Sequence, residues 1–212
     1  MTQTLLDEVT GLVELPVVVT STFDQSFLEL PKELLVSVMV EHQKYFALED
    51  ENGALMSTFL AVSNIPDVKG FVAEGYTKVI TARFNDARFY WETDLKNNLE
   101  HYANQLDKVT FHNKLGSVAD KVRRTEKLTA WLCDNVLTQV DKQTAVRAAK
   151  LSKADLVTGV IFEFPELQGL MGSYYAKRDG EPATVVQTLA AQYEYADFEN
   201  LPPEALVVIL AE

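Results

Sequence analysis

The sequence predicts an α+β protein in which an N-terminal α/β segment with a short antiparallel hairpin precedes an all-helical region. Three observations predict this class. The β-branched run from Val17 to Thr20 is typical of a buried strand. Asn52-Gly53 lies between two apolar runs, which is the pattern of a hairpin. From Val68 onward, apolar residues recur at helical spacing instead.

The N-terminal segment continues from that strand into a helix, for which Pro31 suits the first position because its φ is already helical. Strands are then expected on both sides of Asn52-Gly53. A long helix is predicted over 74–98, with an apolar face formed by Val79, Ile80, Phe84, Ala87 and Tyr90 or Trp91. We expect residues 1–97 to form a partial α/β domain that ends in this long helix.

Residues 98–212 are predicted to form a helical domain, with helices over 115–137, 144–164, 166–178, 183–195 and 202–212. Ser117 caps the first of these helices. Its apolar side is assigned to Val118, Val122, Leu128, Trp131 and Leu132. No polar cap closes the helix that reaches Glu212, so we expect the chain to be an excerpt of a longer protein, cut at its C-terminus.

Two glycines in the stretch 163–176 (EFPELQGLMGSYYA) require an explanation, because glycine inside a helix costs roughly 1 kcal/mol relative to alanine. Gly169, Gly172 and Ala176 are three and four residues apart and therefore share a helix face. We expect a neighbouring helix to approach this face closely, and direct RNA contact is the alternative. One of Tyr174 and Tyr175 is expected in the core.

Composition limits the classes of protein that fit. The 212 residues are 47% hydrophobic, which is enough for a sizeable core. No apolar run reaches the ~18–20 residues that span a membrane, so no membrane partner is expected. The single cysteine, Cys133, excludes an internal disulfide and suits a reducing cytoplasm. It lies in an apolar helical run, where a buried, inert thiol is expected.

The net charge of −12 repels nucleic acid on average, and no DNA partner is expected. The distribution is uneven, however. Residues 108–153 carry 10 basic and 4 acidic groups, whereas the segments before and after them are acidic. Such a basic segment can meet phosphates. The alternative is a solvated helix face whose charges pair with the acidic flanks.

The common catalytic motifs are scarce. The sequence has no phosphate-binding glycine loop, no nucleophile elbow and no paired zinc-ligand spacing. Two clusters could instead contact RNA. In 41–46 (EHQKYF), His42 and Lys44 are donors and the two aromatic residues could stack on bases, or they could enter the core of a strand. In 82–91 (ARFNDARFYW), Arg83 and Arg88 could clamp phosphates or pair with nearby acids.

Taken in order, these stretches resemble a known family. The segments 5–33, 41–46, 82–91, 114–124 and 151–176 together are similar to the β subunit of bacterial heterotetrameric glycyl-tRNA synthetase, over nearly the whole chain. The resemblance implies an internal fragment of a ligase subunit that supports ATP-dependent glycylation of tRNA-Gly. The partners it implies are the catalytic α subunit, which uses ATP and Mg, and tRNA-Gly. It implies a cytoplasmic location.

The resemblance also implies that residues 98–212 are related to the His-Asp (HD) phosphohydrolases. Active members of that superfamily hold a Leu-His-Asp run, where this chain reads Leu151-Ser152-Lys153. Serine is a poor ligand and lysine places a positive charge where a cation would bind, so we expect no catalytic or metal residues and no cofactor in this chain. The candidate tRNA-binding residues are His42, Lys44, Arg83, Arg88, Lys114, Lys121, Arg124, Arg147, Lys150 and Lys153.

Two other functions remain open from the residues alone. One is a protein-interaction scaffold with no RNA contact, which docks through its acidic faces. The other is a metal-dependent HD phosphohydrolase, which the ligand inventory disfavours. Lys114 and Gly116 precede the helix capped by Ser117, and the free amides at that helix start could receive a phosphate.

Overall fold

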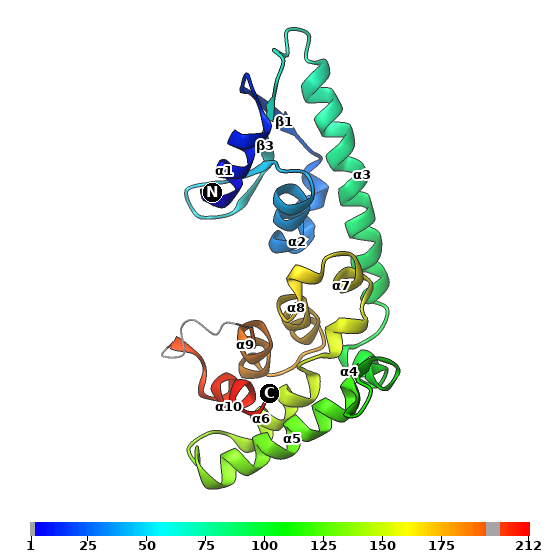
Figure 1. Ribbon diagram of the computed structural model, residues 1–212, viewed down its shortest axis with the longest axis vertical. Helices are drawn as coiled ribbons and strands as arrows, with labels where there is room; N and C mark the ends of the chain where they lie inside the picture. The colour runs from blue at the N-terminus through cyan, green and yellow to red at the C-terminus, as the bar shows by residue number, and fades with distance from the viewer. Residues whose placement is uncertain (1–2, 194–199) are drawn as a thin grey trace. The chain divides into compact units, whose positions relative to one another are not determined.

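The computed structural model describes residues 3–193 and 200–212, which form two compact units, residues 1–92 and 93–212 (Figure 1). A small antiparallel sheet with helices makes up the first unit, and the second is mostly helical. The predicted mixed α+β class is thereby confirmed. Among the described residues, no helix is both long enough and apolar enough to cross a membrane. The predicted domain boundary at residue 97 stays a prediction.

The first unit contains helices, short helical turns and three strands. In chain order they are α1 (Gln3–Leu12), β1 (Val17–Thr22), η1 (Gln25–Glu29), α2 (Lys32–Ser37), the π-helical turn η2 (Val38–His42), β2 (Phe46–Glu49), β3 (Leu55–Ser63) and α3 (Phe71–Asp94), whose last two residues belong to the second unit. The predicted strand, first helix, hairpin and long helix are all present. The sequence analysis did not anticipate α1, and α3 ends four residues earlier than predicted.

The sheet has the order β1-β3-β2, with both pairs antiparallel. Val18 pairs with Val62 and Thr20 with Leu60, so their side chains share a face. The predicted hairpin joins β2 to β3, but its turn is wider than a two-residue Asn-Gly turn. The Asp50 carboxylate accepts hydrogen bonds from the amides of Asn52 and Ala54, and Gly53 adopts a φ of 79°.

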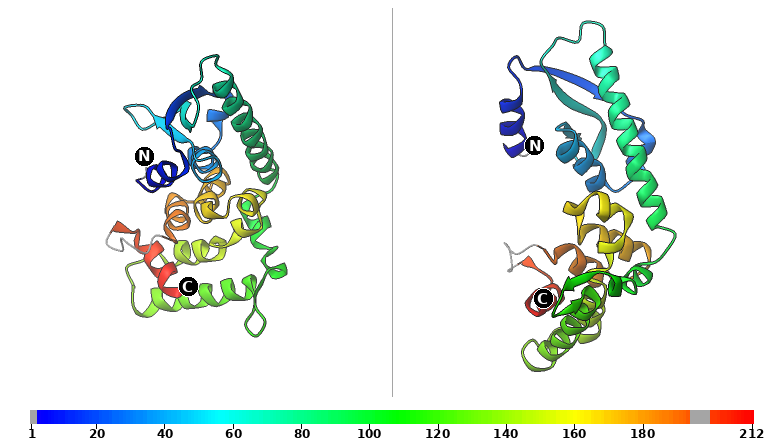
Figure 2. Two further views of the ribbon diagram at one scale, coloured as in Figure 1. Left: turned by 45° about the horizontal axis from the view of Figure 1, so that its top comes forward. Right: turned by 45° about the vertical axis from the view of Figure 1, so that its right-hand side comes forward.

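The sheet lies between α1 on one face and α3 on the other (Figure 2). On the α3 side, the Phe23 ring meets Phe84 edge-on at 4.9 Å, and Tyr45 stacks on Phe59 at 5.0 Å. Phe46 packs beneath α1 on the other face. Tyr45 and Phe46 are therefore both buried in the core. The suggestion that they stack on bases is wrong, because neither ring is accessible.

The second unit begins at residue 93 and is mostly helical, with an exposed two-stranded hairpin. It contains α4 (Leu99–Ala103), η3 (Leu106–Lys108), β4 (Thr110–His112), β5 (Gly116–Ser117), α5 (Val118–Asn135), α6 (Lys142–Leu151), η4 (Ala154–Val157), α7 (Gly159–Glu163), η5 (Pro165–Leu167), α8 (Leu170–Arg178), α9 (Ala183–Ala191) and α10 (Pro203–Ala211). The end of the predicted helix 183–195 lies partly outside the described residues. The hairpin β4–β5 was not predicted.

The predicted helix over 144–164 is wrong, because the chain forms three separate pieces there. Helix α6 ends at Leu151, η4 follows, and α7 starts afresh after Thr158. Asp94 stabilises the start of α7, because its carboxylate accepts hydrogen bonds from the amides of Gly159 (2.8 Å) and Val160 (2.9 Å). Buried Tyr175 donates its hydroxyl to the same carboxylate at 2.9 Å. A tertiary contact therefore replaces the helical bonds that a continuous helix would have made.

The two glycines of 163–176 have different roles, and only one lies within a helix. Gly169 precedes α8 with a φ of 82°, a left-handed conformation that favours glycine. Gly172 faces Asp155, and an added Cβ would lie 3.1 Å from its Oδ2. The close neighbour of Gly172 is thus a buried carboxylate, and the expected shared face is wrong because Gly169 lies before the first residue of α8. Tyr175 is in the core and Tyr174 is half-buried, as expected.

Helix α5 buries only part of the predicted stripe: Val118 and Val122 are buried, and Leu132 packs partly against the core. Leu128 and Trp131 were assigned to its apolar side, but they are 42% and 55% exposed. The buried positions recur every three or four residues and include polar side chains: Val118, Val122, Thr125, Thr129 and Cys133. A search for apolar residues at helical spacing misses this stripe, because two of its buried residues are threonines. Cys133 is buried, as expected, and burial raises the pKa of its thiol.

Candidate functional site

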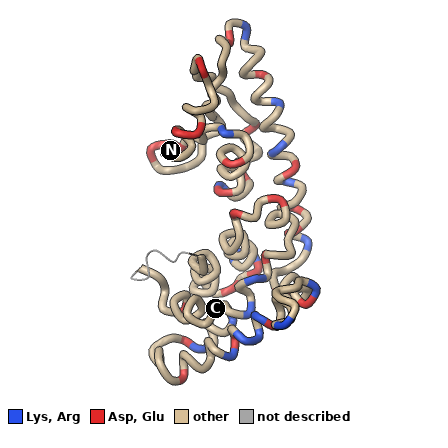
Figure 3. Tube along the Cα trace, in the orientation of Figure 1, with Lys and Arg blue, Asp and Glu red and all other residues tan. Residues whose placement is uncertain are grey.

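Lys and Arg gather on α5 and α6 of the second unit, as Figure 3 shows. The structure sorts the residues of this basic segment into three settings: an exposed group on the β4–β5 hairpin and α5, an ion-paired group on α6, and a buried group near Glu212. The other candidate residues lie in the first unit.

The exposed group forms what we call the basic surface: Lys114, Arg124 and Lys127, with Arg123 beside them in an ion pair with Asp120. Lys114 lies in the turn of the β4–β5 hairpin. Arg124 donates from Nη1 to the carbonyl oxygen of Leu115 at 3.0 Å, which joins this turn to α5. Arg123 and Arg124 are four and three residues before Lys127, so these cations share one side of the helix. Within the described part of the chain, no hydrogen bond or ion pair engages the Lys114 or Lys127 ammonium.

The start of α5 is closed by its own carboxylate. Ser117 Oγ accepts a hydrogen bond from the amide of Asp120, and Asp120 Oδ2 accepts one from the amide of Ser117 at 2.9 Å. Hydrogen bonds to its carboxylate from the Ser117 amide, the Arg123 guanidinium and the Ser117 hydroxyl lower the pKa of Asp120 to about 2. The predicted cap is confirmed. The amides of Ser117, Val118 and Asp120 already have acceptors within the chain, which disfavours the suggested phosphate site.

On α6, Arg147 and Lys150 are tied to acidic groups from elsewhere in the second unit. Arg147 pairs with both Glu181 and Glu100, and Lys150 pairs with Glu100. Lys150, followed by Arg147, lowers the pKa of Glu100, while Glu181 is the main cause that raises the pKa of Arg147. A cavity of about 630 Å³ adjoins this cluster. The two cations of this cluster, Arg147 and Lys150, are neutralised by the two carboxylates of Glu100 and Glu181.

Lys121 and Lys153 converge on the carboxylate of Glu212. The distances from their Nζ atoms to Glu212 Oε1 are 2.7 and 2.5 Å. Lys153 is only 5% exposed, and its ammonium also donates to Gln192 Oε1 and to the Tyr193 hydroxyl. Burial lowers the pKa of Lys153, and Glu212 opposes that shift. Burial alone would raise the pKa of Glu212, but the two lysines together lower it.

The first unit holds the remaining four candidates, His42, Lys44, Arg83 and Arg88. Lys44 adopts a φ of 58° and pairs with Glu8 at 3.0 Å. Arg88 lies over the Phe27 ring, 4.3 Å from its centroid, and donates to Ser26. Arg83 is exposed on α3, and His42 ends the π-helical turn η2. The ten candidate residues are divided between the two units, and their contact with tRNA stays a prediction.

The donor set near Ser152 and Lys153 does not suit a metal ion. Ser152 Oγ donates to the carbonyl oxygen of Ala149, and the Lys153 ammonium is buried beside Glu212. Across residues 3–193 and 200–212, no three His, Cys, Asp or Glu side chains are grouped to hold a metal ion. The ammonium groups of Lys121 and Lys153 already face the nearby Glu212 carboxylate.

Two residues of interest escaped the sequence analysis. Lys127 was omitted, although its spacing from Arg123 and Arg124 could have indicated a shared side. Asp94 was considered only as a partner for arginine. Its role depends on residues 65, 66 and 81 positions away, for which a single sequence gives no signal.

Comparison with known proteins identifies the family. The family model described as glycyl-tRNA synthetase beta subunit matches residues 1–211. The chain is 46% identical over 203 residues to the glycine–tRNA ligase beta subunit of Nitratidesulfovibrio vulgaris strain DP4, covering 95% of this chain and 29% of the relative. It is 47% identical over 213 residues to that of Chromohalobacter salexigens, covering 98% and 30%. For Dichelobacter nodosus the identity is 42% over 213 residues, covering 100% and 31%.

The chain thus spans about 30% of the length of these curated relatives. The match agrees with the resemblance seen in the sequence and covers both structural units. The chain belongs to the glycyl-tRNA synthetase β subunit family.

Proposed function

We propose that this chain serves ATP-dependent glycylation of tRNA-Gly as part of a β subunit, by holding the sugar-phosphate backbone of the tRNA on the basic surface. One observation carries the proposal. In a chain of net charge −12, cations lie exposed and side by side on the β4–β5 hairpin and α5. Neutralising phosphates releases the counterions condensed on RNA, so such a surface gains affinity without reading bases.

The neighbourhood of the basic surface suits RNA in a second respect. Phe111 on β4 is exposed, and the Lys121 ammonium lies 5.4 Å from the centre of its ring. An exposed aromatic ring beside cations can stack on an unpaired base. Arg147, Lys150 and Lys153 fit the role less well, since binding a phosphate there would first break their ion pairs.

The proposal assigns the chemical step to the α subunit, which would bind ATP and Mg. We further propose that the second unit retains the scaffold of the HD phosphohydrolases without their metal chemistry. Support comes from Lys153, whose buried ammonium is paired with Glu212. A side-chain cation in that position repels a divalent ion.

The experiment compares two triple variants with equal loss of charge. Lys114→Ala/Arg124→Ala/Lys127→Ala removes the basic surface. Lys32→Ala/Lys69→Ala/Lys78→Ala is the matched control in the first unit. Both are made in the 212-residue chain and in the complete synthetase, and tRNA-Gly affinity and glycylation are measured.

We expect the basic-surface variant to weaken tRNA binding at least tenfold and to raise KM for tRNA, while the control changes either by less than twofold. Unchanged affinity in both proteins, or an equal loss in the control, contradicts the proposal. Co-purification with the α subunit should persist, because the changed residues are surface cations.

A second candidate function is docking onto the α subunit without RNA contact. Exposed Leu128 and Trp131 on α5 favour it, because aromatic residues are enriched in the buried centres of protein interfaces. Loss of α-subunit binding in Leu128→Ala/Trp131→Ala, together with unchanged tRNA affinity in the basic-surface variant, would favour docking over RNA contact.

A further inference from the structure

Strand β1 is an edge of its sheet, because the order β1-β3-β2 gives it one neighbour among the described residues. The amide of Phe23 donates to the carbonyl oxygen of Ser57 at 3.0 Å. In an antiparallel ladder the bonded positions alternate, so Val19 and Ser21 also bond to β3. The amides and carbonyls of Val18 and Thr20 therefore point away from the sheet.

This free edge has defined ends. At one end, the Thr22 carbonyl oxygen accepts the hydroxyl of Thr77 at 2.9 Å, which closes the edge. At the other, Pro16 has no amide proton, and the amides of Glu14 and Leu15 are already bonded to Asn64 Oδ1. The open stretch is thus residues 17–21, which is long enough for four main-chain hydrogen bonds from Val18 and Thr20.

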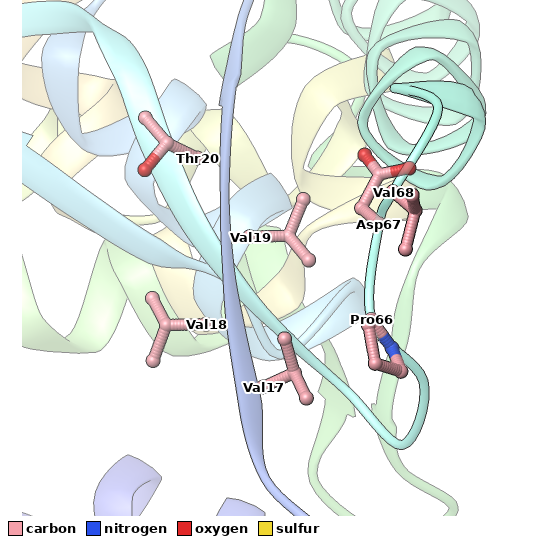
Figure 4. A pocket seen from close by; sticks show the side chains of 7 residues that line it. All are labelled: Val17, Val18, Val19, Thr20, Pro66, Asp67 and Val68. Carbon is pink, nitrogen blue, oxygen red and sulfur yellow. The ribbon is translucent and has the colours of Figure 1, made fainter.

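A cavity of about 420 Å³ follows this stretch, lined by residues 17–20 and 66–68. Figure 4 shows Val17 and Val19 on the side of β1 that faces the 66–68 segment, and Val18 and Thr20 on the other side. The segment is fixed in place, because Asp67 accepts the amides of Val72 and Ala73 at the start of α3. The cavity is therefore a formed groove beside the free edge.

The groove has valines and Pro66 beside polar Thr20 and Asp67, and β1 itself lacks the charges, prolines and bulges that protect edge strands. Residues 17–22 (VVVTST) carry no charge and no proline, and β1 pairs with β3 without a bulge. Val18 is 63% exposed and Val68 is 87% exposed. Exposed apolar side chains beside unpaired main-chain groups are the features that an added strand uses.

We propose that the free edge of β1 binds an extended strand from the part of the β subunit that this chain does not span. The relatives are about three times longer than the matched region, so a large amount of chain is available as the occupant. The added strand bonds to Val18 and Thr20 and places apolar side chains against Val18 and Val68. This inference rests on family membership and is independent of RNA binding.

Hydrogen exchange at single-residue resolution tests the proposal in the 212-residue chain and in the complete β subunit. In the chain alone, we expect the amides of Val18 and Thr20 to exchange rapidly while those of Val19 and Ser21 are protected. In the complete subunit, the Val18 and Thr20 amides should exchange at least 100-fold more slowly. Equal rates for these two amides in both proteins overturn the proposal.

Two further measurements separate the possible occupants. If a second copy covers the edge, the isolated chain will dimerise as its concentration rises, and the Val18 and Thr20 amides will then exchange more slowly. That result overturns the assignment of the added strand to the same subunit. Val18→Lys should leave the unfolding midpoint of the isolated chain unchanged and lower that of the complete subunit. Met56→Lys, also at an exposed strand position, is the control and should not produce that difference. An equal effect of Val18→Lys on both proteins contradicts the proposal.

Discussion

Replacing Asp94 by alanine should destabilise the second unit more than any exposed substitution of the same kind. Asp94 is almost fully buried, and its carboxylate accepts the amides of Gly159 and Val160 and the hydroxyl of Tyr175. Hydrogen bonds to a charged group contribute about 1.5–3 kcal/mol each, and a buried donor left without a partner costs about 1–3 kcal/mol. Because these terms overlap, we expect a loss of about 3–5 kcal/mol in unfolding free energy.

Native-state hydrogen exchange of peptides that cover α7 and α8 measures this loss locally. At about 1.4 kcal/mol per factor of ten, exchange through opening of this region should be roughly 150- to 5,000-fold faster in Asp94→Ala. Tyr175→Phe removes one of the three bonds and should cost about 1 kcal/mol. In the double variant, the two losses should not add, because both remove the same hydrogen bond.

Asp107→Ala is the matched control, since Asp107 is an exposed carboxylate in the same unit. It should change the unfolding free energy by less than about 0.5 kcal/mol. The reasoning fails if Asp94→Ala speeds exchange less than fivefold, or if Asp107→Ala has an equal effect.

Three further predictions concern the same fold. Gly172→Ala should lower the unfolding free energy by about 1–3 kcal/mol, because the added Cβ would press on the Asp155 carboxylate. Gly75→Ala has open space on α3 and should raise the unfolding free energy by roughly 0.5–1 kcal/mol. Equal effects of the two variants in urea titrations would contradict this. Burial raises the pKa of Asp155 from 3.8 to about 6, so between these values the folded protein retains a proton that the unfolded chain has lost. The unfolding free energy should therefore fall as pH rises from about 4 to 6, by at most ~1.4 kcal/mol per pH unit. An unchanged slope of unfolding free energy against pH in Asp155→Asn would refute this. Lys153→Met should cost about 3 kcal/mol and Lys127→Met almost nothing, measured by urea denaturation, and similar losses would show that the Lys153 pair contributes little.

Local chemistry made much of the first unit predictable. The β-branched run at 17–20, the Asn52-Gly53 signal and the long apolar spacing around Phe84 each act over a few residues, and each produced the expected element. Burial of Tyr45 and Phe46 was less certain from sequence, because an aromatic residue in a strand suits either a core or a stacking surface. Tyr45 lies in the core because its ring stacks on Phe59.

The second unit depends more on contacts between distant residues. The break between α6 and α7 is stabilised by Asp94, and the buried stripe of α5 contains threonines that an apolar pattern omits. Most of the candidate RNA-contacting residues were chosen by their charge. Charge does not reveal that Lys153 is buried or that Arg147 is held by two glutamates, because both depend on tertiary structure.

The salt dependence of tRNA-Gly affinity tests the central claim most directly. The measurement compares the slope of log affinity against log salt concentration for the unmodified protein and for Lys114→Ala/Arg124→Ala/Lys127→Ala. If these three cations each neutralise a phosphate, the slope should become shallower by roughly 2–3 in the variant and stay unchanged in the Lys32→Ala/Lys69→Ala/Lys78→Ala control. An identical slope and affinity in the unmodified protein and the basic-surface variant would contradict the account.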